Sequence, residues 1–89
     1  MNFVKIECDF VIREGYDIVQ AIQVCQTLQD PHTKKRELQG LIEAMAAYQL
    51  KKGLIITEDE TDALPVEHNG VTYRIEIIPC WKWLLSYGP

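Results

Sequence analysis

One long amphipathic helix constrains the fold more than any other feature of this chain of 89 residues. Asp30 followed by Pro31 is a typical helix start, because Asp caps the first free N–H groups and Pro fits the first helical turn. Residues 51–53, Lys-Lys-Gly, are typical of a helix end. Between them, apolar residues recur at intervals of three and four, at Leu38, Leu41, Ile42, Met45 and Tyr48. We therefore predict a helix over residues 31–52 that buries one face against another layer.

The segments before this helix have the composition of two strands. Residues 3–12 alternate apolar and polar side chains, which is the pattern of a half-buried strand. Residues 18–26 are mostly apolar and β-branched, as in a central strand covered on both faces. Residues 13–17 form a turn between them, in which Gly15 can adopt a positive φ. We predict that the two strands form an antiparallel hairpin.

Two further strands and a short helix are predicted after the long helix. Residues 53–57 form a short apolar strand, and residues 58–62 form an acidic loop. Asn69-Gly70 is a strong hairpin-turn signal, and residues 72–78 alternate as a strand. The aromatic residues 80–87 form a short helix. The predicted order is β-β-α-β-β-α, an α/β (α+β) domain with a small mixed sheet. The long helix covers one face, and either the C-terminal aromatic segment or a partner covers the other.

We predict that residues 1–89 form a single domain. Its composition excludes several classes of protein. The chain is 47% apolar and 25% charged, which is ordinary for a folded globular domain. It has neither a signal peptide nor a run of the ~20 apolar residues that a membrane span needs. Nine cations against 13 acidic residues give a net charge of −4, which disfavours general nucleic-acid binding and leaves only a local or metal-assisted role. Three cysteines without CxxC spacing predict reduced thiols in a cytoplasmic protein, with no disulfide or zinc site.

Three segments of the chain carry a resemblance to a known family. They are residues 7–11 with 22–25, residues 33–38, and residues 53–57 followed by Asn69-Gly70 and the ending Ile-Ile-Pro-Cys-Trp-Lys-Trp-Leu-Leu at 77–85. In this order they resemble the C-terminal domain of unknown function found on bacterial and archaeal AAA-type ATPases. That domain is similar to the PD-(D/E)xK restriction-endonuclease-like fold. The resemblance covers nearly the whole chain and implies the C-terminal part of such a core, downstream of an ATPase module.

The resemblance also implies where a catalytic site would lie. Endonuclease-like cores hydrolyse phosphodiesters with Mg²⁺ held by carboxylates on neighbouring strands, and a Lys two residues after the second carboxylate assists the water. On this chain the first carboxylate falls on Asp9 and the Glu-x-Lys position on Gln23-Val24-Cys25. Asp9 and Gln23 are equidistant from Tyr16, so a hairpin centred there makes them cross-strand neighbours on one side.

Two of the three catalytic positions depart from the active pattern. Gln23 offers a neutral oxygen, and Cys25 carries no positive charge at neutral pH, since its reference pKa is ~8.5. Lys34, Lys35 or Arg36 could supply the missing charge from the start of the helix. The favoured hypothesis is therefore a non-enzymatic accessory domain with a degenerate site and no cofactor.

The remaining hypotheses differ in the partner and in the chemistry. The accessory domain packs against its ATPase or against another copy, with Trp81 and Trp83 as core or interface anchors. The alternative is a Mg²⁺- or Mn²⁺-dependent nuclease that uses Asp9 and Gln23, and a third reading is a stand-alone interaction module with the same tryptophans. We also predict self-association, because a core without its upstream helix and strand has an open edge or an uncovered face.

Overall fold

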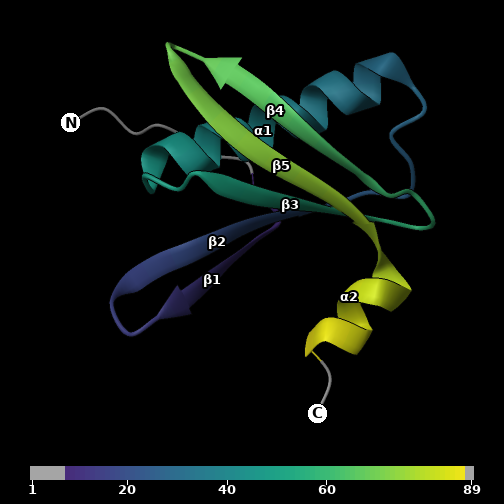
Figure 1. The fold of residues 1–89 in the computed structure, drawn as a ribbon, viewed down its shortest axis with the longest axis horizontal. Helices are drawn as coiled ribbons and strands as arrows, with labels where there is room; N and C mark the ends of the chain where they lie inside the picture. The colour runs from purple at the N-terminus through teal and green to yellow at the C-terminus, as the bar shows by residue number, and fades with distance from the viewer. Residues whose placement is uncertain (1–7, 88–89) are drawn as a thin grey trace.

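The computed structural model describes residues 8–87, which form five strands and two helices around one mixed sheet (Figure 1). The strand order is β1-β2-β3-β5-β4, in which the outer pairs are antiparallel and β2, β3 and β5 run parallel. This arrangement confirms the predicted mixed α+β fold. The elements are β1 (Phe10–Glu14), β2 (Asp17–Val24), α1 (Pro31–Ala47), β3 (Lys52–Thr57), β4 (Asp62–His68), β5 (Val71–Pro79) and α2 (Cys80–Tyr87).

The antiparallel β1–β2 hairpin is confirmed, but its first strand is shifted from the prediction. The predicted strand at 3–12 lies outside the described residues over 3–7, and the observed strand continues to Glu14. The turn is reduced to Gly15-Tyr16, with Gly15 at φ 63°. Because a two-residue turn of this hand matches the strand twist, Glu14 pairs with Asp17 across it.

Helix α1 begins where the sequence predicts and ends five residues earlier. The Asp30 carboxylate accepts a hydrogen bond from the His32 backbone N–H at 2.9 Å, which confirms the cap. The predicted end at residue 52 is wrong, because Gln49 adopts a left-handed φ of 59° and stops the helix. The Leu50 N–H then donates to the Met45 carbonyl at 2.8 Å, and Lys52 already belongs to β3.

Strand β4 is absent from the predicted order, so the described residues form five strands and not four. It pairs antiparallel with β5 across Asn69-Gly70, the turn that the sequence does indicate. Pro65 in the middle of β4 argues against a strand, yet an edge strand tolerates Pro because one side of its backbone needs no partner. Leu64 and Val66 alternate with exposed residues as a half-buried strand requires.

The two faces of the sheet are covered unequally. Helix α1 packs over β2 and β3 and contributes Leu41, Ala44 and Met45 to the main core (Figure 1). The opposite face has a smaller cluster of Ile22, Leu54 and Ile56, against which the Trp83 side chain of α2 packs. The aromatic C-terminal segment therefore covers part of the second face, one of the two predicted options. No helix among the described residues is long and apolar enough to cross a membrane.

Candidate functional site

Asp9 and Gln23 lie directly opposite each other at the open end of the β1–β2 hairpin. The Asp9 backbone N–H donates to Gln23 Oε1 at 2.8 Å, and the Val24 backbone N–H donates to Asp9 Oδ2 at 2.8 Å. The last regular pair of the hairpin is Phe10 with Ile22, so Asp9 and Gln23 form the next pair, as predicted. The reason differs from the predicted one, because the turn is centred between Gly15 and Tyr16, and a shift of register between Ile12 and Arg13 moves the later pairs by one residue. Their side chains extend the hydrogen-bonded ladder beyond the end of β1.

Both residues line a polar pocket of about 340 Å³ between the hairpin and α1. Gln23 is 5% exposed, whereas Asp9 is open to solvent. The opposite wall is formed by Arg36, Glu37 and Gly40 of α1. The second acidic side chain of the pocket is therefore Glu37 from the helix, and not a residue of β2.

Glu37 was not singled out from the sequence, where residues 34–37 read as a solvated helix turn. It lies four residues before the fully buried Leu41, so helical periodicity places it on the inward face. Burial raises the pKa of the Glu37 carboxyl, and the nearby Asp9 charge raises it further, while Arg36 lowers it. Arg36 forms an ion pair with Glu37 at 3.8 Å. The helical spacing between Glu37 and Leu41 could have predicted that Glu37 faces inward, but Glu37 was grouped with the charged residues 34–36 on the solvated side of the helix.

Cys25 occupies the position at which the resemblance implies a catalytic lysine. Burial raises the pKa of its thiol to about 11, with added contributions from the charges of Glu37, Glu60 and Asp9. The group is a neutral thiol at pH 7 and supplies no positive charge. The three cysteines are free thiols.

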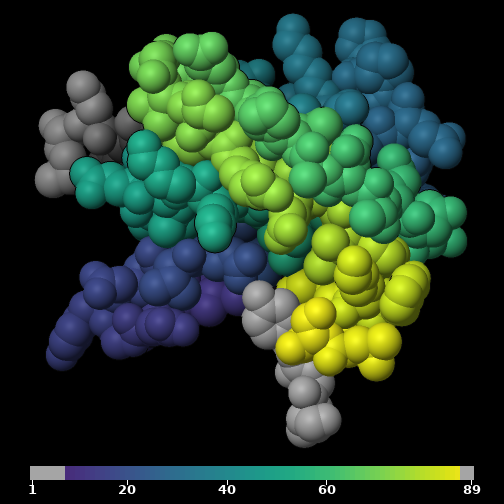
Figure 2. All heavy atoms as spheres, viewed as in Figure 1, coloured from purple at the N-terminus to yellow at the C-terminus, as the bar shows by residue number. Residues whose placement is uncertain are grey.

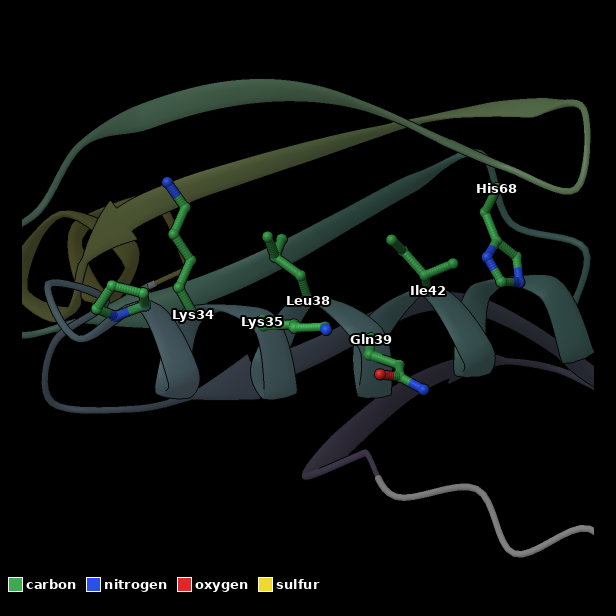
Figure 3. A pocket seen from close by; sticks show the side chains of 7 residues that line it. Lys34, Lys35, Leu38, Gln39, Ile42 and His68 are labelled. Atoms are coloured by element: carbon green, nitrogen blue, oxygen red, sulfur yellow. The ribbon is translucent and has the colours of Figure 1, made fainter.

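The basic residues at the start of α1 are divided between two places. Of the three that could supply the missing charge, Arg36 lines the pocket with Asp9. Lys34 points from α1 toward β4 in a separate groove of about 480 Å³, beside Leu38 and Ile42 (Figure 3). His68 points back from the end of β4 toward α1, and Lys35, which also lines this groove, lies along the helix (Figure 3). Of the residues that the structure describes, the pocket near Asp9 thus contains a guanidinium already paired with Glu37 and no lysine.

The donor set around Asp9 fits a hard divalent cation poorly. Mg²⁺ and Mn²⁺ need several free carboxylate or carbonyl oxygens. Gln23 Oε1 and Asp9 Oδ2 already accept backbone N–H groups, which leaves Asp9 Oδ1 and the Glu37 carboxylate. Within residues 8–87 there is no group of three or more His, Cys, Asp or Glu that could hold a metal ion.

The two tryptophans of α2 lie in different environments. Trp83 packs against the sheet, while Trp81 is 61% exposed. Leu84 and Leu85 are exposed as well, so the outer side of α2 presents an apolar stripe. Figure 2 shows α2, in yellow, standing out from the molecule beside the β1–β2 hairpin, in purple. An apolar groove of about 390 Å³ runs between them, lined by Phe10, Val11, Ile12, Ile22, Val24, Ile56, Cys80 and Trp83.

The fold and the pocket define a small α+β protein with a mixed five-stranded sheet and a polar pocket between its first hairpin and its long helix, lined by two carboxylates, Asp9 and Glu37. Comparison with protein-family models, with curated proteins and with solved structures found no match.

Proposed function

We propose that this chain is a non-catalytic interaction domain of the kind carried by prokaryotic AAA-type ATPases, acting in the cytoplasm without a metal or other cofactor. One observation carries the proposal: the Asp9 and Gln23 oxygens that a nuclease would place on its metal accept backbone N–H groups at 2.8 Å. These side chains hold the end of the hairpin together. The residue resemblance to a degenerate endonuclease-like core supplies the class of partner.

The remaining groups of the pocket support a structural role. The Cys25 side chain is a thiol, which carries no positive charge in any protonation state, and burial raises its pKa to about 11. A phosphodiesterase needs positive charge near the developing negative charge of the transition state. Among residues 8–87, the cation that lines the pocket is Arg36, which is already paired with Glu37.

The apolar surface on the other side of the sheet supports an interaction role. Trp81, Leu84 and Leu85 form an exposed stripe on α2, next to the groove that runs to β1. Contiguous apolar patches on small monomers are rare and mark contact sites. The partner is an ATPase module or a second copy of this chain.

A metal-dependent nuclease is the second candidate, and one observation favours it. Asp9 and Glu37 line the same pocket, and the Asp9 charge raises the pKa of the Glu37 carboxyl. A bound Mg²⁺ or Mn²⁺ would relieve this repulsion. In that case the second carboxylate would be Glu37 in place of Gln23.

A titration with Mn²⁺, followed by NMR, separates the two candidates. Paramagnetic broadening of the amides around Asp9 and Glu37 is measured in the wild type and in Asp9→Asn, in which the amide oxygen can still accept the Val24 N–H. We expect no difference between the two proteins and no cleavage of DNA or RNA. As a positive control, Gln23→Glu with Cys25→Lys restores the nuclease pattern and should gain localised broadening.

Broadening and cleavage that are present in the wild type and lost in Asp9→Asn would overturn the non-catalytic proposal.

A separate experiment tests the interaction role. An AAA-type ATPase should co-purify with the wild-type chain and be lost with Leu85→Glu on the apolar stripe. Lys82→Glu, which adds the same acid elsewhere on α2, should retain it.

A further inference from the structure

Three cations gather at one end of the sheet, far in sequence from the Asp9 pocket. Lys51, Lys52 and Arg74 line a pocket of about 380 Å³ together with Thr72. Its remaining wall is built mainly from the apolar residues Ala63, Leu64, Pro65 and Tyr73. None of the lining residues is acidic, although the chain has 13 acidic residues and only nine Lys and Arg. The charge of this pocket is thus opposite to that of the whole molecule.

The sheet holds two of these cations side by side. Lys52 of β3 is the register partner of Arg74 of β5, and the two strands run parallel. Tyr73 and Ile75, on either side of Arg74, belong to the core beneath α1, so Arg74 and Lys52 face the opposite side of the sheet. The Arg74 backbone N–H also donates to the Lys51 carbonyl at 2.9 Å, which fixes the third cation to the same place.

The positive charges of Lys51, Lys52 and Arg74 repel one another unless an anion is bound between them. Like charges directly opposite on neighbouring strands destabilise a sheet. Arg36, by comparison, is paired with Glu37. Among residues 8–87, no carboxylate forms an ion pair with Lys51, Lys52 or Arg74. The donors therefore remain available to a ligand from outside the chain.

We propose that this pocket is a binding site for a phosphate group. The Arg74 guanidinium is a planar fork suited to two phosphate oxygens, and the two ammonium groups add point charges around the same anion. The Thr72 hydroxyl is a further donor on the same strand, and the apolar wall reduces screening by water. The phosphate can belong to a small phosphorylated molecule or to the backbone of a nucleic acid. The site is independent of the function proposed above and lies on the other face of the sheet from Gln23 and Glu37.

An NMR titration of the ¹⁵N-labelled chain with inorganic phosphate tests the site. Sodium chloride at equal ionic strength is the reference for general screening. We expect saturable shifts at the amides of Lys51, Lys52, Thr72 and Arg74 with phosphate and none with chloride. Replacing both partners, Lys52→Gln with Arg74→Gln, should weaken binding by at least ~10-fold, because each removes a charge-assisted hydrogen bond. The matched control is Lys34→Gln with Lys35→Gln, which removes the same charge on α1 and should leave the affinity unchanged.

Pyrophosphate and a short single-stranded DNA distinguish the two sources. Tighter binding of pyrophosphate than of DNA assigns the site to a small phosphorylated ligand. Tighter binding of DNA with a steep dependence on salt assigns it to a nucleic-acid backbone. Shifts that do not saturate, that chloride reproduces, or that the control variant weakens equally would overturn the proposal. A dispersed spectrum of each variant shows that it is folded.

Discussion

Gln23 is a buried amide in a position where a carboxylate would be costly. Its Oε1 accepts the Asp9 N–H, and the Asp9 and Glu37 carboxyl groups line the same pocket. A glutamate at residue 23 would add a third acidic group to a small polar cavity and raise the pKa values of its neighbours. A neutral amide keeps the same hydrogen bond without that repulsion. At this scale the pocket is organised to close a hairpin.

The Cys25 thiol should react unusually slowly in the folded protein. Burial and the charges of Glu37, Glu60 and Asp9 raise its pKa from 9.0 to about 11. At pH 8 its thiolate fraction is then about 100-fold below that of an ordinary thiol, and the thiolate is the nucleophile. We expect iodoacetamide to label the exposed Cys80 first and Cys25 last, as measured by peptide mass spectrometry over time.

The same labelling in concentrated urea is the control, because the unfolded chain has no environment to shift the pKa. There Cys25 should be labelled at the rate of an ordinary thiol. Equal rates for Cys25 in native buffer and in urea would contradict the raised pKa of this thiol in the folded protein.

The sequence correctly predicted that Asp9 lies opposite Gln23, but it did not predict that Glu37 lines the same pocket. The sequence places Asp9 opposite Gln23 by symmetry about Tyr16, but the turn is centred between Gly15 and Tyr16, and the pair forms because the register shifts by one residue between Ile12 and Arg13. Glu37 reaches the pocket through the packing of α1 on the sheet, which is a tertiary contact. The direction in which α1 crosses the hairpin depends on side-chain packing and has no local signal.

At the scale of elements, helix α2 combines two surfaces of opposite role. Trp83 packs on the cluster of Ile22, Leu54 and Ile56, while Trp81 points outward from the same helix. Residues two apart on a helix lie about 200° from each other, so one cannot share the environment of the other. The inward residue attaches α2 to the sheet, and the outward stripe is left for a partner.

Replacing the two tryptophans should therefore have different effects on stability. Trp83→Ala removes an aromatic side chain from the second face of the sheet and should lower the free energy of unfolding by about 2–3 kcal/mol. Trp81→Ala is the matched control on the same helix and should cost less than about 1 kcal/mol. Urea denaturation followed by circular dichroism measures both. Equal losses would mean that α2 is not attached through Trp83.

The elements that the sequence mispredicts share one physical cause. The end of α1 depends on Gln49 adopting a left-handed conformation, which is usual for Gly or Asn at a helix end and is not expected for Gln. Strand β4 contains Pro65, and its acceptance depends on lying at the edge of the sheet. Neither outcome has a clear signal in the local sequence, whereas the cap at Asp30 and the turn at Asn69-Gly70 are set locally.

At the scale of the whole molecule, the two edges of the sheet are protected unequally. The β4 edge carries Pro65 between the acidic residues Asp62 and Glu67, a pattern that discourages strand pairing. The β1 edge presents the exposed Phe10 and Val11 and has no further strand beside it among residues 8–87. The exposed stripe of α2 and the groove beside it continue the apolar surface on one side. An unprotected edge strand of this kind can pair with a strand of another chain.

This asymmetry predicts that the chain self-associates through the β1 edge. Multi-angle light scattering at micromolar concentration should give twice the monomer mass of 10.3 kDa. Val11→Lys should restore the monomer, because a lysine on an open edge opposes the approach of a second strand. Val19→Lys is the matched control: Val19 is 40% exposed and Val11 41%, but Val19 lies on β2, on the inner side of the hairpin, where the register skips it between Ile18 and Gln20. It should leave the dimer intact.

A wild-type mass of 10.3 kDa at every concentration would contradict the prediction of self-association and leave the ATPase module as the proposed partner. Loss of the dimer in both variants would instead mean that added charge alone disrupts it, so the contact would not be assigned to β1.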